Sequence, residues 1–277
     1  MYRQIPTPTI ETQLKTVLRA LRGLNFYTMA APAPVTAPKE SPPEQARRGR
    51  LLTSVYAAVV LVATAAFVGL AVFVRQEDVI TNFDAPIAQA IQSINTPVLS
   101  WLLLHISDLG WAPLDVACVV IIAGAFAALR LRLEAVLVVV STLAAGEVGT
   151  LTKDVVQRAR PTANFVHLAG HLADFSFPSG HVIFATVLFG TTFGIVLIVW
   201  SGSILRNAIL ALLAALVLLM GPSRIYMGEH WPTDVLGAYC LGGLWVAGTL
   251  EVLLALRPRV RPWWQGREFR RRWKPLV

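Results

Sequence analysis

Long apolar runs separated by short polar segments dominate the chain from residue 51 onward. A helix that crosses a bilayer needs roughly 20 apolar residues, and the runs predict six spans, at 51–74, 112–129, 134–156, 180–200, 204–220 and 234–256. The stretch 82–111 is interrupted by polar residues and predicts an interfacial helical segment instead of a span. We therefore expect an all-α polytopic membrane protein, a six-helix transmembrane bundle with an interfacial helical segment between the first two spans.

Composition agrees with a membrane protein. Hydrophobic residues make up 55 % of the chain and charged residues 14 %, whereas soluble domains carry about 25 % charged residues. The two cysteines, Cys118 and Cys240, lie in apolar runs. They read as small core residues and predict neither a disulfide nor a metal framework.

The chain divides into three predicted parts: an N-terminal segment 1–50, a six-span domain 51–256 and a basic tail 257–277. Apolar residues at helical spacing in 10–21 predict a short basic amphipathic helix, although a disordered or over-extended N-terminus remains open. A Pro- and Ala-rich linker is expected over 31–45. The Arg- and Trp-rich tail favours anionic lipid headgroups as its partner, and nucleic-acid binding is not expected.

Basic residues predict the orientation of the spans. With six spans, the basic loops and the tail fall on one side, which is then cytoplasmic together with both termini. Every polar cluster described next falls on the opposite, extracytoplasmic side. We expect the plasma membrane of a bacterium, because no organelle-targeting signal is evident.

The first polar cluster, KDVVQRARP, closes the third predicted span and contains Lys153, Arg158 and Arg160. Lys153 and Arg160 are seven residues apart, so both can lie on one helix face if the helix continues. Two cations without an obvious local partner fit an anionic ligand. The alternative is a lysine at a span end that reaches toward the interface.

The second cluster, DFSFPSGHVIF, precedes the fourth span. Ser179 is placed to cap that helix, and the free backbone N–H groups of Gly180 and His181 would favour an anion. The alternative is a plain capped helix with a polar histidine at the interface.

The third cluster, SRIYMGEHWPTDVLG, lies between the last two spans. Asp234 follows His230 by four residues and could orient its imidazole, leaving the other nitrogen free as a nucleophile. Arg224 adds a cation, and Pro232 suits the first turn of a helix. A structural cap or a metal site remains open; a zinc site needs a third ligand, for which His181, His167 or His171 would serve, but we expect no metal.

Two further carboxyls are notable. Glu147 lies within the third predicted span, where a carboxyl needs a partner, and we expect a structural hydrogen bond for it. Glu229, beside His230, has no predicted role. Together the three clusters predict a cation-rich pocket with two histidines, suited to phosphate and its transfer.

These motifs resemble the type 2 phosphatidic acid phosphatase family of integral membrane lipid phosphatases. The family's three motifs occur in order, as Lys153 with Arg160-Pro161, as Pro178-Ser179-Gly180-His181, and as Ser223-Arg224 with His230 and Asp234. The resemblance covers roughly 51–256. It implies that Lys153, Arg160, Ser179, Gly180 and Arg224 bind the phosphoryl group, that His230 is the nucleophile oriented by Asp234, and that His181 is the general acid.

The resemblance implies a metal-independent phosphatase, without a cofactor, that acts on a lipid phosphate or diphosphate through a phosphohistidine. Isoprenoid diphosphate is favoured as the substrate over phosphatidylglycerol phosphate and phosphatidic acid. A lipid phosphotransferase of the same family and a non-catalytic lipid-phosphate binding or transport protein are the alternatives. Vanadate-dependent haloperoxidases share similar motifs but are soluble.

Overall fold

The computed structural model describes residues 42–264 apart from 77, 95 and 171. The predicted N-terminal amphipathic helix and the tail after residue 264 lie outside these residues. Within them the secondary structure is entirely helical. This confirms the all-α class.

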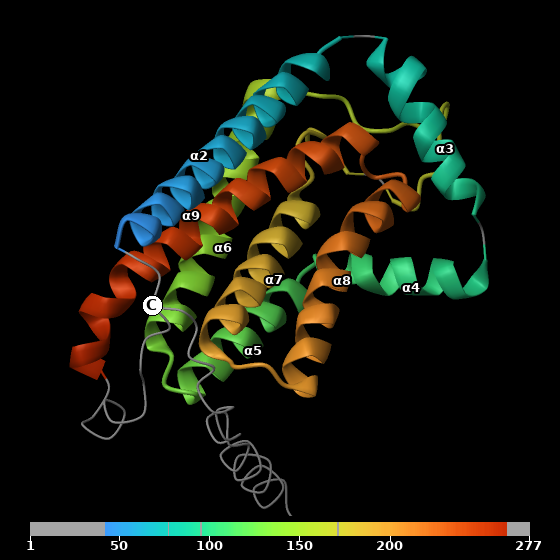
Figure 1. The fold of residues 1–277 in the computed structure, drawn as a ribbon. Helices are drawn as coiled ribbons and strands as arrows, with labels where there is room; N and C mark the ends of the chain where they lie inside the picture. Colours follow the sequence, from blue (N-terminus) through green and yellow to red (C-terminus); the bar gives the residue numbers. More distant parts are fainter. Residues whose placement is uncertain (1–41, 77, 95, 171, 265–277) are drawn as a thin grey trace, which may run out of the picture.

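Five described helices are long and apolar enough to cross a membrane. They are α2 (Pro42–Phe73), α6 (Arg132–Val156), α7 (Gly180–Val199), α8 (Ile204–Tyr226) and α9 (Pro232–Trp264). Figure 1 shows α2 and α9 side by side, with α6, α7 and α8 behind or beside them. The chain is thus an integral membrane protein built around a helix bundle.

The second predicted span is shorter than expected. Helix α5 (Leu114–Ala128) has 15 residues, which corresponds to about 22 Å at ~1.5 Å per residue, less than the ~30 Å of a hydrocarbon core. The left-handed backbone of Arg130 (φ 61°) follows its end. The predicted count of six full spans is therefore not confirmed; five helices meet the length and α5 does not.

The stretch predicted as interfacial is three short helices instead of one. A π-helical turn η1 (Ile80–Asp84) leads directly into α3 (Ala85–Ser93), and α4 (Pro97–Asp108) follows. Thr96 caps α4, because its hydroxyl accepts from the Leu99 amide at 3.4 Å. In Figure 1, α4 runs transverse to the long helices and lies beside α8.

Helix α7 forms the centre of the bundle. It packs against α6, α8 and α9, and it is the most buried of the five long helices. Glycines allow this closeness: a Cβ on Gly194 would overlap the Leu250 side chain of α9, and one on Gly242 would overlap Thr186 of α7. Small residues at such contacts are typical of membrane helix packing.

Polar side chains inside the bundle are paired across α6 and α9. Ser141 and Thr249 share a hydrogen bond of 2.7 Å. Two turns closer to the start of α6 and to the end of α9, buried Glu134 lies 3.3 Å from Arg257. Glu147, in contrast, is exposed on α6, and its side chain makes no hydrogen bond within the described residues, contrary to our prediction.

Several helix ends differ from the sequence-based prediction. Helix α2 begins at Pro42, inside the predicted linker 31–45 and across the predicted boundary at residue 51. Helix α8 continues through Pro222 to Tyr226, so Arg224 lies in its last turn and not after it. Helix α9 begins at Pro232, as predicted, but continues past residue 256 into the predicted tail.

Candidate active site

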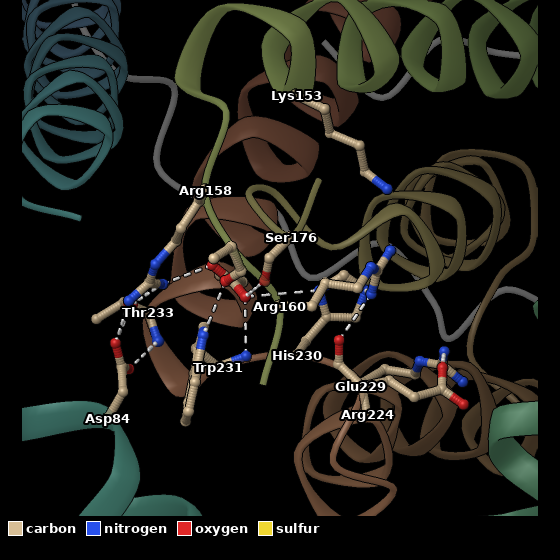
Figure 2. Close-up of polar contacts among 12 residues, drawn as sticks. Asp84, Lys153, Arg158, Arg160, Ser176, Arg224, Glu229, His230, Trp231 and Thr233 are labelled. Carbon is tan, nitrogen blue, oxygen red and sulfur yellow. Dashed lines mark hydrogen bonds and ion pairs between the residues drawn. The ribbon is translucent and has the colours of Figure 1, made fainter. Parts of the chain in front are cut away.

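The predicted site residues come together at one end of the bundle, which we call the site end. Helix α6 stops there, α7 and α9 begin there, and α8 finishes there, with the loops 157–179 and 227–231 between them. Figure 2 shows the polar side chains of these segments converging around His230. The polar residues thus lie at the ends of the long helices and in the loops that join them, and the helices themselves stay continuous.

His230 is 2 % exposed and lies between a carboxylate and a guanidinium. Its Nε2 is 3.2 Å from Arg160 Nη1, and its Nδ1 is 3.6 Å from Asp234 Oδ2. An arginine can only donate, so Nε2 accepts and the ring proton resides on Nδ1, facing Asp234. The distance to Asp234 exceeds a hydrogen bond, so the predicted bond is an electrostatic contact here.

The surroundings keep His230 neutral. Burial lowers the pKa of His230 to about 4. Asp234 acts in the opposite direction, and the charges of Arg160 and Arg224 reinforce the lowering. A neutral imidazole with its lone pair on Nε2 is the form a nucleophile requires.

Lys153 and Arg160 converge, but not in the predicted way. Helix α6 ends at Val156, and Gln157 adopts a left-handed conformation (φ 54°), so Arg160 is not on the same helix face as Lys153. The two cations meet at Asp174, which forms ion pairs with Lys153 Nζ and, at 2.6 Å, with Arg160 Nη2.

Asp174 is a half-exposed carboxylate between two predicted phosphate ligands. Partial burial acts to raise the pKa of Asp174, but the hydrogen bonds and charges of Lys153 and Arg160 outweigh it and the pKa is lowered. The carboxylate therefore stays charged. Its two oxygens lie where an anionic ligand of the same cations would bind.

The start of α7 presents buried polar atoms without partners. Ser179 occupies the N-cap position, as predicted, but its hydroxyl makes no capping bond. Ser179 Oγ and His181 Nε2 are buried without a partner within the described residues. The first N–H groups of any helix also lack intrahelical partners, so this helix start is suited to an anion.

Arg224 is fully buried and is held by three neighbours. It pairs with Glu229 and donates to Ser107 Oγ. Its guanidinium also lies 5.5 Å from the centre of the Trp111 ring. Glu229, to which the sequence assigned no role, is the counter-charge of Arg224.

A short segment between α4 and α5 covers the histidine of α7. The Trp111 ring packs edge-on against His181, with 4.5 Å between ring centres. A Cβ on Gly110 would overlap the His181 ring. Only glycine at this position lets the segment approach so closely.

Sequence analysis missed four supporting residues: Asp84, Ser107, Asp174 and Ser176. Asp174 and Ser176 belong to the second cluster quoted above, and their closeness to the motif was the available signal. Asp84 and Ser107 lie in the segment between α2 and α5, and no local pattern marks them. Arg158, seen in the sequence but not assigned, turns out to pair with Asp234.

The described residues offer no ready metal site. No three His, Cys, Asp or Glu side chains among them are grouped to hold an ion. His167 is exposed, and its backbone amide donates to Gln92 Oε1 at 3.0 Å, on the α3 side of the loop. His171 lies outside the described residues.

Comparison with known proteins gives a consistent family. Residues 134–257 match the family model described as the PAP2 superfamily. The phosphatidylglycerophosphatase B of Bacillus subtilis is 27 % identical over 164 residues, 59 % of this chain and 79 % of that protein. The undecaprenyl-diphosphatase of Sulfolobus acidocaldarius is 32 % identical over 122 residues, 43 % of this chain and 54 % of that protein.

A third relative matches a shorter stretch. The provisionally named undecaprenyl-diphosphatase YbjG of Escherichia coli is 41 % identical over 83 residues, 28 % of this chain but only 34 % of the relative. The fold also resembles a crystal structure from Bacillus subtilis, that of a transmembrane PAP2-type phosphatidylglycerolphosphate phosphatase. The TM-score is 0.63 at 23 % identity, over 71 % of this chain and 96 % of that one. Residues 134–257, which contain all three motifs, therefore match the PAP2 superfamily.

Proposed function

We propose that the protein is a metal-independent phosphatase of membrane lipid phosphates or diphosphates. The observation that carries the proposal is the neutral, buried His230, whose Nε2 lone pair faces Arg160 and which also lies in the field of the Arg224 charge. Cations around a nucleophile attract the phosphoryl group to it and stabilise the charge of the transition state.

In the first step, Lys153, Arg160 and Arg224 hold the phosphoryl oxygens, and the donors of Ser179 and Gly180 assist. Arg160 moves from His230 Nε2 to a phosphoryl oxygen, which frees the lone pair. Nε2 then attacks phosphorus, the bond to the leaving oxygen breaks, and His181 donates its proton to that oxygen. The product is a phosphohistidine, and Asp234 stabilises the imidazole that carries it.

In the second step, water attacks the phosphohistidine. His181, now neutral, accepts a proton from the water, and the N–P bond to His230 breaks. Inorganic phosphate leaves, and both histidines return to their initial states. Side chains supply all the positive charge of this scheme, so it needs no metal ion.

The substrate class follows from the membrane setting and from the relatives. Two relatives are named for undecaprenyl diphosphate and one for phosphatidylglycerophosphate. We favour an isoprenoid diphosphate, and the basic loops predict that the site end faces away from the cytoplasm of a bacterium. The basic tail would then bind anionic headgroups of the cytoplasmic leaflet.

The test is phosphate release from an isoprenoid diphosphate, a phosphatidylglycerol phosphate and a phosphatidic acid in mixed micelles, with and without EDTA. We expect release by wild type in both conditions, none by His230→Gln, and an acid-labile phosphoprotein that accumulates in His181→Gln. His105→Gln is the matched control, because among the described residues this exposed histidine contacts its helix neighbour Trp101, through the carbonyl and the ring, and no residue of the site. Lipid-phosphate binding without release by wild type would contradict the proposal.

A further inference from the structure

A buried carboxylate far from the motifs reaches the site. Asp84 is 0 % exposed and belongs to the turn η1 between α2 and α3. Its Oδ1 accepts from the Thr233 amide at 2.9 Å, and its Oδ2 accepts from the Thr233 hydroxyl at 2.8 Å. The same Oδ2 forms an ion pair with Arg158 Nη2. One aspartate thus fixes both the start of α9 and a guanidinium.

Arg158 extends this contact to the carboxylate beside His230. Its Nη1 donates to Asp234 Oδ1 at 2.6 Å and to Thr233 Oγ1 at 2.5 Å. The arginine is 5 % exposed. Figure 2 shows Arg158 directed toward Asp84 and Thr233, away from Lys153 and Arg224. Arg158 is therefore not in position to bind the same anion as Lys153, Arg160 and Arg224.

The second oxygen of Asp234 is also occupied. Oδ2 accepts from the Trp231 amide at 2.8 Å and from the Ser176 hydroxyl. Asp234 is thus held from both sides, and its orientation toward His230 Nδ1 is set by groups other than the histidine. The contacts form one continuous chain from Asp84 through Arg158 and Asp234 to His230.

A purely structural cap of α9 would need fewer buried charged groups. One oxygen that accepts from the Thr233 amide would satisfy the helix start. Burying a guanidinium and two carboxylates beside it carries a large desolvation cost, and the pairing leaves a net negative charge next to His230. Such contacts can orient the carboxylate partner of a histidine, in the way that outer partners orient the ligands of a metal ion.

We propose that Asp84 and Arg158 are positioning residues that fix Asp234 and set the electrostatic potential at His230. The catalytic consequence rests on the phosphatase function proposed above, whereas the effect on the imidazole does not. Asp84 lies outside residues 134–257, the stretch that matches the family model. The segment between α2 and α3 then belongs functionally to the site.

The two charges act on His230 with opposite signs. Arg158 weakens the negative potential of Asp234, so removing its charge favours the protonated imidazole. Asp84 offsets Arg158, so removing its charge disfavours the protonated imidazole. The other charged or titratable groups around the ring come from every neighbouring element and stay constant in these variants: Lys153, Arg160, Asp174, His181, Arg224, Glu229 and Asp234.

The test compares Asp84→Asn, Arg158→Gln and Arg158→Lys of the full chain in detergent micelles. The kcat and KM are measured with an isoprenoid diphosphate in mixed micelles, and the titration midpoint of His230 is followed by ¹⁵N-histidine NMR, assigned with His230→Gln. Glu134→Gln is the matched control, because it alters a buried carboxylate–arginine pair of α6 and α9 away from the site. Circular dichroism and gel filtration identify any variant that does not fold.

We expect kcat to fall about 10- to 100-fold in Asp84→Asn and Arg158→Gln, with KM changed less than twofold. The His230 midpoint should rise by about one pH unit in Arg158→Gln and should not rise in Asp84→Asn. Arg158→Lys keeps the charge and should retain the wild-type midpoint. Glu134→Gln should behave as wild type in both assays.

The inference is overturned if folded Asp84→Asn and Arg158→Gln keep the wild-type midpoint and kcat and lose only thermal stability, because a structural role alone predicts that result. If wild type releases no phosphate, the proposed function fails. The NMR midpoints then still decide whether Asp84 and Arg158 act on His230.

Discussion

Asp174 pairs with two of the cations that we propose bind the phosphoryl group, so removing its charge should strengthen phosphate binding. In the structure this carboxylate is paired with Lys153 and Arg160. A phosphate that uses these two cations must compete with it. We predict that Asp174→Asn binds inorganic phosphate more tightly than wild type.

The exposure of the carboxylate limits the size of the effect. The Asp174 side chain is 53 % exposed, whereas the side chains of Lys153 and Arg160 are 14 % and 11 % exposed. Exposed ion pairs contribute about 0.2–1 kcal/mol each, so the two pairs together contribute about 0.4–2 kcal/mol. Because ~1.4 kcal/mol is a factor of ten, the affinity should increase about 2- to 30-fold.

Isothermal titration calorimetry with inorganic phosphate at fixed ionic strength measures this affinity without relying on turnover. The lowered pKa keeps Asp174 charged at neutral and mildly acidic pH, so the gain should persist over about pH 6–8. Asp154→Asn is the matched control, since Asp154 is an exposed neighbour of Lys153 in sequence with the same charge. An affinity for phosphate in Asp174→Asn that is unchanged or weaker would refute the competition.

Three further predictions concern the histidines and the helix contacts. Gly110→Ala should lower kcat about 10- to 100-fold, because the added Cβ overlaps the ring of His181 and displaces it. Because burial holds the pKa of His230 at about 4, kcat/KM should not fall through its protonation until the pH approaches that value. A fall of kcat/KM on the acidic side near pH 6.5, seen with both monophosphate and diphosphate lipids, would contradict this. Gly237→Ala should destabilise the protein by about 1–3 kcal/mol, measured by thermal unfolding, because its Cβ overlaps the buried ring of Phe177.

Glycines in open space provide the controls for these substitutions. A Cβ on Gly243 meets no atom within 4 Å among the described residues, so Gly243→Ala should keep the wild-type stability and kcat. If Gly243→Ala loses as much stability as Gly237→Ala, overlap with Phe177 is not the cause.

The motif residues could be predicted because each cluster is local in sequence and lies at a helix end. Ser179 and Pro232 mark the starts of α7 and α9 through ordinary start signals. The convergence of Lys153 and Arg160 was predicted correctly from a geometry that is wrong, since α6 ends before Arg160. Their common partner Asp174, not a shared helix face, brings them together.

The residues that support the site, such as Asp84 and Arg158, could not be predicted in the same way. Asp84 reads as one of several polar residues in an interfacial segment, and its partner Thr233 is 149 residues later. A pairing across that separation leaves no local pattern. Arg158 was visible, but its direction depends on the turn after Val156, which the helical period does not reveal.

The distance along the chain between Asp84 and Thr233 also has a consequence in time. At about 5–20 residues per second, roughly 7–30 s pass between the synthesis of these two residues, which are 149 positions apart. Until α9 emerges, the Asp84 carboxylate lacks Thr233, and Arg158 lacks Asp234. The last of the long helices therefore completes the site, and a nascent chain that stops before Pro232 has most of the bundle but lacks Asp234, the carboxylate beside His230.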